Sequence, residues 1–156
     1  MRIYHTSNLV VSEPDVYHSR EHLDFGEGMY LTYLEKQARD YGQRFIRRDE
    51  PAIMNIYEFT DDFSDFKRKF FPEYDGEWLD YVAACRKGLP HEQYDIIEGG
   101  IADDNVFDTV DLYLQGIYTR DQALDQLRFK KPNHQICITS QKVIDRNLKY
   151  IESITL

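Results

Sequence analysis

The segment Asn133-His134-Gln135-Ile136-Cys137-Ile138-Thr139, near the end of the chain, shows the clearest strand pattern in the sequence. Its side chains fall alternately on two faces: Gln135, Cys137 and Thr139 on one, and His134, Ile136 and Ile138 on the other. Because strand side chains repeat with a period of two, the pattern predicts a strand over 134–139. Helical patterns stand on either side of it, one starting at Thr119 and a short one at Ser140.

The rest of the chain mixes strands and helices in the same way. Apolar periodicity predicts helices over 34–48, 75–88 and 106–116, and strands over 2–4, 52–59, 94–98 and 148–156. Asp75 and Gly88 are suited to start and end one helix, and Thr119 with Gln122 has the spacing of a capping box. Residues 6–28 lack sustained periodicity and form a long loop, a type of segment that is often functional.

This order lacks regular alternation of strand and helix, which favours an α+β fold over a doubly wound parallel sheet. A length of 156 residues fits a single domain spanning 1–156. The net charge of -9 disfavours nucleic acid as a partner, because it repels a phosphate backbone. No apolar run is long enough for a membrane span or a cleaved signal. Cys85 and Cys137 sit in apolar patterns and suit buried thiols of a reducing compartment, so we expect a cytoplasmic protein.

Several common sites are excluded by their motifs. Gly26-Glu27-Gly28 begins a dinucleotide fingerprint, but Leu31 stands where the third glycine belongs. No lysine follows a glycine loop as in a phosphate-binding P-loop. The five histidines show no metal-binding spacing, and we predict no metal site.

Three segments remain that together suggest chemistry: residues 4–7 (YHTS), 24–32 (DFGEGMYLT) and 133–136 (NHQI). The set resembles ADP-ribosyltransferases of the His-Tyr-Glu type, which include the poly(ADP-ribose) polymerases and diphtheria-like toxins. It is more closely similar to a family of small bacterial proteins listed as a domain of unknown function. That likeness covers nearly the whole chain and also includes YDIIEGGIADD at 94–104 and HQICIT at 134–139. The resemblance implies a split β-sheet core with flanking helices.

The resemblance further implies NAD as co-substrate and a role for each segment. His5 would bind a ribose hydroxyl, Ser7 or its backbone the nicotinamide amide, and Tyr30 the nicotinamide ring. Thr6 and Phe25 belong to the same cofactor-binding segments, where glycines allow close backbone approach; these are Gly26 and Gly28. Arg20, in the long loop, is the candidate for the pyrophosphate. By residue type alone, the histidine also fits a structural role, the tyrosine a core position and the arginine a solvated charge.

The third segment departs from the family pattern. Active relatives carry Glu where this chain has Gln135, which can accept a hydroxyl hydrogen bond but carries no charge. Asp103 and Asp104 are the candidates to supply a carboxylate, and either one also fits an ordinary helix N-cap. Glu27 is a weaker substitute that suits a solvated charge, and His134, on the face of the isoleucines, suits a structural role.

The expected function is that of a mono-ADP-ribosyltransferase, which cleaves the nicotinamide-ribose bond of NAD and transfers ADP-ribose to a macromolecule, with protein favoured as acceptor. Two alternatives stay open: a catalytically silent NAD or ADP-ribose binding module, and an NAD glycohydrolase that uses water. Relatives of the smaller family are implied to act as bacterial toxins paired with a small antitoxin protein, or as effectors.

Overall fold

The computed structural model describes residues 1–19, 23–62 and 64–156 and has the predicted α+β class. Its strands in chain order are β1 (Arg2–Ser7), β2 (Met29–Leu31), β3 (Ile53–Phe59), β4 (Arg68–Phe71), β5 (Ile96–Gly99), β6 (Gln135–Ile138) and β7 (Leu148–Thr155). The helices are α1 (Glu35–Ile46), α2 (Gly76–Lys87), α3 (Asp104–Leu114), α4 (Arg120–Leu127) and α5 (Gln141–Asn147). None of the helices in the described part of the chain is long and apolar enough to cross a membrane.

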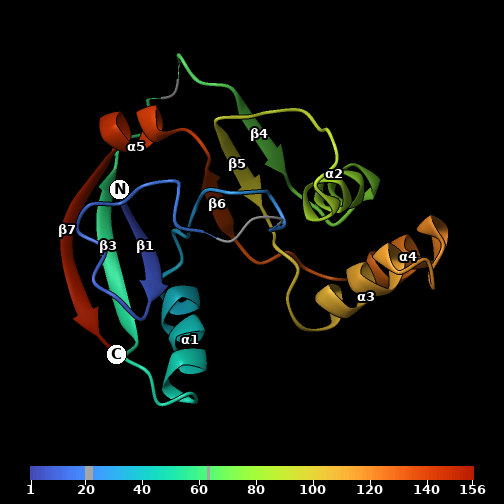
Figure 1. Ribbon diagram of the computed structural model, residues 1–156, viewed down its shortest axis with the longest axis horizontal. Coiled ribbons are helices and arrows are strands. Elements are labelled where there is room, and N and C mark those ends of the chain that lie inside the picture. Colours follow the sequence, from blue (N-terminus) through green and yellow to red (C-terminus); the bar gives the residue numbers. More distant parts are fainter. Residues whose placement is uncertain (20–22, 63) are drawn as a thin grey trace.

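The strands form two sheets that lie next to each other (Figure 1). One sheet has the antiparallel order β1-β3-β7, and the other has the order β2-β6-β5-β4, in which β4 and β5 are parallel. In the part of the chain that the structure describes, one antiparallel bridge connects the sheets, between Tyr4 of β1 and Thr32, the residue after β2. In Figure 1, α1 lies beside β1, whereas α2, α3 and α4 lie on the far side of the second sheet.

Both faces of the second sheet are buried, and β6 shows how. Ile136 and Ile138 belong to a core to which both sheets contribute, whereas Cys137 belongs to a core that α2, α3 and α4 complete. This is the alternation that the sequence predicts for the strand. Both cysteines, Cys85 and Cys137, are buried and free, as predicted.

The local signals at helix ends are confirmed. The Asp75 side chain accepts a hydrogen bond from the backbone of Trp78, and Gly88 ends α2 in the left-handed conformation. Thr119 and Gln122 form the predicted capping box of α4. The sequence pattern fails to predict two strands. β2 has three residues, too few for a periodicity, and β4 is a short edge strand that begins with Arg68 and Lys69.

Candidate functional site

The two sheets part at His5. Tyr4 and Thr32 exchange two backbone hydrogen bonds, of 2.9 and 3.0 Å. In an antiparallel ladder such a pair recurs at every second residue, so Thr6 and Tyr30 would form the next one. Among the described residues, however, the bridge between Tyr4 of β1 and Thr32, which directly follows β2, is the only one between the two sheets. In place of a second pair, Nδ1 of His5 lies 2.8 Å from the carbonyl oxygen of Tyr30. The imidazole thus lies where the two sheets part, beyond the Tyr4–Thr32 bridge. We call this place, at His5 and the Tyr30 carbonyl, the fork.

This contact determines the chemistry of the His5 ring. A carbonyl oxygen can only accept a hydrogen bond, so Nδ1 must carry a proton. Burial lowers the pKa of His5 below its usual 6.5, which favours the neutral ring at pH 7. Nε2 is then an unprotonated acceptor, and no residue in the described part of the chain binds it. His5 therefore offers an acceptor to a hydroxyl group.

Thr6 contributes its main chain to the fork. Its side chain is buried and donates a 2.8 Å hydrogen bond to the carbonyl of Ala38 in α1. Its backbone N–H and C=O point to the same strand edge as those of Tyr4, toward β2, because these groups alternate along a strand. The Ser7 hydroxyl is used locally, since it donates to the carbonyl of Leu9 and accepts from its N–H.

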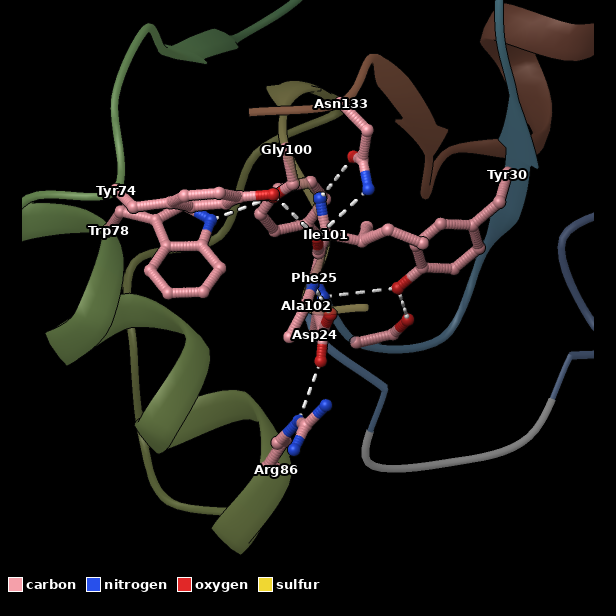
Figure 2. A network of polar contacts seen from close by, with 11 residues as sticks. Asp24, Phe25, Tyr30, Tyr74, Trp78, Arg86, Gly100, Ile101, Ala102 and Asn133 are labelled. Atoms are coloured by element: carbon pink, nitrogen blue, oxygen red, sulfur yellow. Dashed lines mark hydrogen bonds and ion pairs between the residues drawn. The ribbon is translucent and has the colours of Figure 1, made fainter. Parts of the chain in front are cut away.

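Tyr30 is anchored by its hydroxyl. This group donates a 2.6 Å hydrogen bond to the carbonyl of Gly26 and accepts one of 3.1 Å from the N–H of Phe25 (Figure 2). Burial raises the pKa of Tyr30, so the hydroxyl stays protonated. The ring lies parallel to that of Phe25, with 6.5 Å between centroids. The ring, rather than the hydroxyl, is therefore what Tyr30 can offer to a ligand.

Glycine is required at two positions of this turn, Gly26 and Gly28, for different physical reasons. Gly26 has a φ of 82°, a left-handed conformation that favours glycine. Gly28 has no room for a side chain, since a Cβ there would lie 2.6 Å from the carbonyl oxygen of Ile138 and 2.8 Å from Sγ of Cys137. Gly28 thus permits close packing of the turn on β6.

Gln135 begins β6 on the face that also carries Tyr30. Tyr30 pairs with Cys137, and Gln135 is two residues further along, which corresponds to a diagonal neighbour at about 7–8 Å in a sheet. The Gln135 side chain is partly exposed, and the described residues provide no partner for its amide. Tyr30 therefore lies next to both other residues: His5 contacts its carbonyl, and Gln135 is its diagonal neighbour in the sheet.

The structure describes the remaining candidates, Asp103, Asp104 and Arg20, to different extents. Asp103 is the N-cap residue of α3, but its exposed carboxylate makes no capping hydrogen bond. Asp104 is the first residue of α3, and the structure describes its backbone but not its side chain. Arg20, the candidate for the pyrophosphate, lies outside the described residues. The absence of a capping bond leaves the Asp103 carboxylate available for another role.

The comparison with known proteins gives a family for this chain. A family model described as "Protein of unknown function (DUF3990)" matches residues 1–150. The chain belongs to the DUF3990 family. No curated protein and no solved structure gives a match. The expected likeness to a domain-of-unknown-function family is thereby confirmed, and the wider likeness to ADP-ribosyltransferases remains a prediction.

In this DUF3990 chain, a buried ion pair ties the Tyr30 turn to the segment before α3 (Figure 2). Oδ1 of Asp24 lies 2.6 Å from Nε of Arg86 in α2, and Oδ2 accepts a 2.6 Å hydrogen bond from the N–H of Ala102. Asp24 directly precedes Phe25, whose N–H binds the Tyr30 hydroxyl. One carboxylate therefore joins two candidate site segments.

In this DUF3990 chain, side chains also hold the two residues before Ala102, which are Gly100 and Ile101 (Figure 2). Nε1 of Trp78 donates to the carbonyl of Gly100 at 2.8 Å. The Asn133 amide accepts from the N–H of Ile101 at 2.9 Å and donates to its carbonyl at 3.2 Å, and the Tyr74 hydroxyl also donates to that carbonyl. Residues 100–102 are therefore rigidly placed, and they lead directly to Asp103.

Sequence reasoning missed Glu98 as the partner of His134. Nε2 of His134 lies 3.0 Å from Oε1 of Glu98, and Nδ1 lies 3.0 Å from Oγ1 of Thr32. Both side chains lie on the face of Ile136, opposite to Gln135. The signal available in the sequence was a lone acid in the apolar strand Ile96-Ile97-Glu98, since a half-buried carboxylate requires a partner.

A pocket of about 670 Å³ adjoins the Tyr30 turn on its other side. Its walls include Phe25, Gly26 and Glu27 together with Tyr81 and Tyr94. Neither His5 nor Gln135 lines it, so it is separate from the fork.

Proposed function

We propose that this protein is a mono-ADP-ribosyltransferase, which cleaves the nicotinamide-ribose bond of NAD and transfers ADP-ribose to a macromolecular acceptor, with protein favoured over nucleic acid. The observation that carries the proposal is the His5 ring at the fork, 2.8 Å from the Tyr30 carbonyl, with Nε2 left as an acceptor. Gln135 lies nearby on the Tyr30 face.

The fork offers groups that match the nicotinamide end of NAD. Nε2 of His5 can accept a hydrogen bond from a ribose hydroxyl. The Thr6 N–H and C=O complement a primary carboxamide, whose oxygen accepts and whose NH₂ donates. The Tyr30 ring supplies a flat surface for a heteroaromatic ring. A ribose, an amide and a planar ring occur together in this end of NAD.

The reaction on this proposal resembles glycoside cleavage. Nicotinamide leaves with the electrons of the bond, the ribose gains oxocarbenium character, and the acceptor nucleophile attacks the same carbon and loses a proton. Gln135 can accept a hydrogen bond from a ribose hydroxyl, and Asp103 or Asp104 would supply the negative charge that Gln135 lacks. Arg20 keeps its proposed role at the pyrophosphate. Pairing with an antitoxin protein remains part of the proposal on the family resemblance alone.

A silent binding module is the second candidate, and the neutral side chain of Gln135 favours it. Such a module would use the acceptor of His5 and the main chain of Thr6 for binding alone. It predicts saturable binding of NAD without release of nicotinamide.

The test is to incubate purified protein with NAD and cell extract, and to measure both nicotinamide release and ADP-ribose adducts. His5→Ala and Gln135→Ala should abolish or strongly reduce both signals. His91→Ala is the matched control, because Nδ1 of His91 also lies 2.8 Å from a backbone carbonyl, that of Leu89, away from the fork. This control should behave like the unsubstituted protein.

The other outcomes separate the alternatives. Saturable NAD binding in calorimetry without release of nicotinamide would identify a silent module. Release without any macromolecular acceptor would identify an NAD glycohydrolase. If NAD neither binds nor is cleaved across many extracts, the proposal is wrong.

A further inference from the structure

The residue before Gln135 is held through its main chain by α1. The side-chain amide of Gln37 donates from Nε2 to the carbonyl of His134 at 2.5 Å, and its Oε1 accepts from the N–H of His134 at 3.0 Å. One amide therefore binds both backbone polar groups of one residue. This fixes the peptide planes on both sides of His134, including the plane that leads into Gln135.

The His134 ring is fixed as well. The Thr32 hydroxyl accepts a hydrogen bond from the N–H of Leu34 at 3.1 Å, so its own proton is free to be donated to Nδ1 of His134. The network therefore assigns the ring proton to Nε2, which donates to Glu98. The Tyr33 ring lies 5.3 Å away. His134 is consequently restrained at both main chain and side chain.

The Gln135 backbone pairs with Gly99 of β5, but its side chain has no such restraint. Its amide has no partner among the described residues, so the direction of its side chain depends on the backbone that precedes it. Misplacement of a reacting group by about 1 Å can cost on the order of 100-fold in rate. The neighbouring backbone must therefore be held if Gln135 acts on a ribose hydroxyl.

We infer that Gln37 and His134 form a clamp that positions Gln135 in the proposed NAD site, with Gln37 as the positioning residue. This inference rests on the proposed function. A tie between α1 and β6 with no role at the site would affect stability alone. The clamp instead predicts a change in the cleavage step of a protein that is still folded.

The experiment compares Gln37→Ala with Gln43→Ala, which removes a glutamine from an exposed position on the same helix. Steady-state nicotinamide release gives kcat and KM for NAD at a temperature where circular dichroism shows both variants folded. We expect Gln37→Ala to lower kcat about 10- to 100-fold with KM changed less than about twofold, since placement rather than binding is lost. Gln43→Ala should leave both constants unchanged.

A second measurement does not need turnover. Nitrogen relaxation of the Gln135 side-chain amide, recorded by NMR, should show greater mobility in Gln37→Ala than in Gln43→Ala. If the alanine variant does not fold, Gln37→Glu replaces it, because the carboxylate still accepts from the His134 N–H and loses the donor to its carbonyl.

The outcomes distinguish the two proposals. Equal Gln135 mobility in the folded Gln37 and Gln43 variants would overturn the clamp, whether or not NAD is cleaved. If NAD is cleaved, equal kcat in the two variants would overturn it as well. Absence of NAD binding and cleavage in the unsubstituted protein would instead overturn the proposed function, and the mobility of Gln135 would then decide whether the clamp holds this side chain.

Discussion

Replacement of Asp24 by asparagine should destabilise the protein strongly. The side chains of Asp24 and Arg86 are 8% and 14% exposed, and their charged atoms lie 2.6 Å apart. The asparagine could still accept a hydrogen bond from Ala102, so the change mainly removes the charge that compensates Arg86. Loss of one partner of a buried pair costs about 3–5 kcal/mol. The guanidinium also lies over the Phe107 ring, 4.7 Å from its centroid, so we expect the lower end, about 3 kcal/mol.

The assay is urea unfolding of Asp24→Asn, Arg86→Met and the double variant. In thermal unfolding, the same loss of about 3 kcal/mol would lower the Tm by roughly 6–12 °C for a chain of this size. The double variant should recover much of the loss, because an apolar residue tolerates the buried position that an unpaired charge does not. Asp80→Asn is the control, since its pair with Arg120 is exposed. A coupling free energy below about 1 kcal/mol, typical of surface pairs, would refute the reasoning.

Three further predictions concern packing, pH and thiol reactivity. Gly28→Ala should cost about 1–3 kcal/mol in urea unfolding, because its Cβ would overlap the Ile138 carbonyl; an unchanged midpoint would contradict the packing. Since burial lowers the His5 pKa, the unfolded chain binds this proton more tightly, so stability should fall as the pH drops below about 6.5. His5→Gln should flatten that dependence, as measured by urea unfolding at pH 7.5 and 5.5; equal slopes would argue against it. Burial raises the pKa of Cys85 to about 11 and of Cys137 to about 12, so neither should react with a thiol reagent at pH 8 until urea unfolds the protein. Labelling of either thiol in the folded protein would contradict this burial.

Short-range signals in the sequence predict much of the fold. The caps at Asp75, Gly88 and Thr119 act within one helical turn, and each is confirmed by its hydrogen bonds or dihedral angles. β2 and β4 escape prediction for a physical reason. Their pairing with β6 and β5 comes from distant parts of the chain, and such tertiary context decides whether a short segment becomes a strand.

The candidate site was predictable in its residue types more than in its contacts. The motifs single out His5, Tyr30 and Gln135, which the structure places around the division between the sheets. They do not reveal that the Tyr30 hydroxyl binds Gly26, or that Thr6 turns its side chain toward α1. Each of these hydroxyl groups has a hydrogen-bond partner that depends on the folded backbone, and the order of residue types along the chain does not specify it.

The position of Glu98 sharpens the question of charge at the proposed site. In the β5–β6 register, Glu98 pairs with Ile136, one residue from Gln135, which makes it a neighbouring carboxylate in the sheet. It lies on the opposite face, however, and its Oε1 is bound to Nε2 of His134. Charge for an oxocarbenium-like state would therefore have to come from another direction, and Asp103, whose carboxylate makes no capping bond, ends the rigid segment held by Asp24. On the proposed function, removal of the charge in Asp103→Asn should thus lower the rate of nicotinamide release more than its removal in Glu98→Gln.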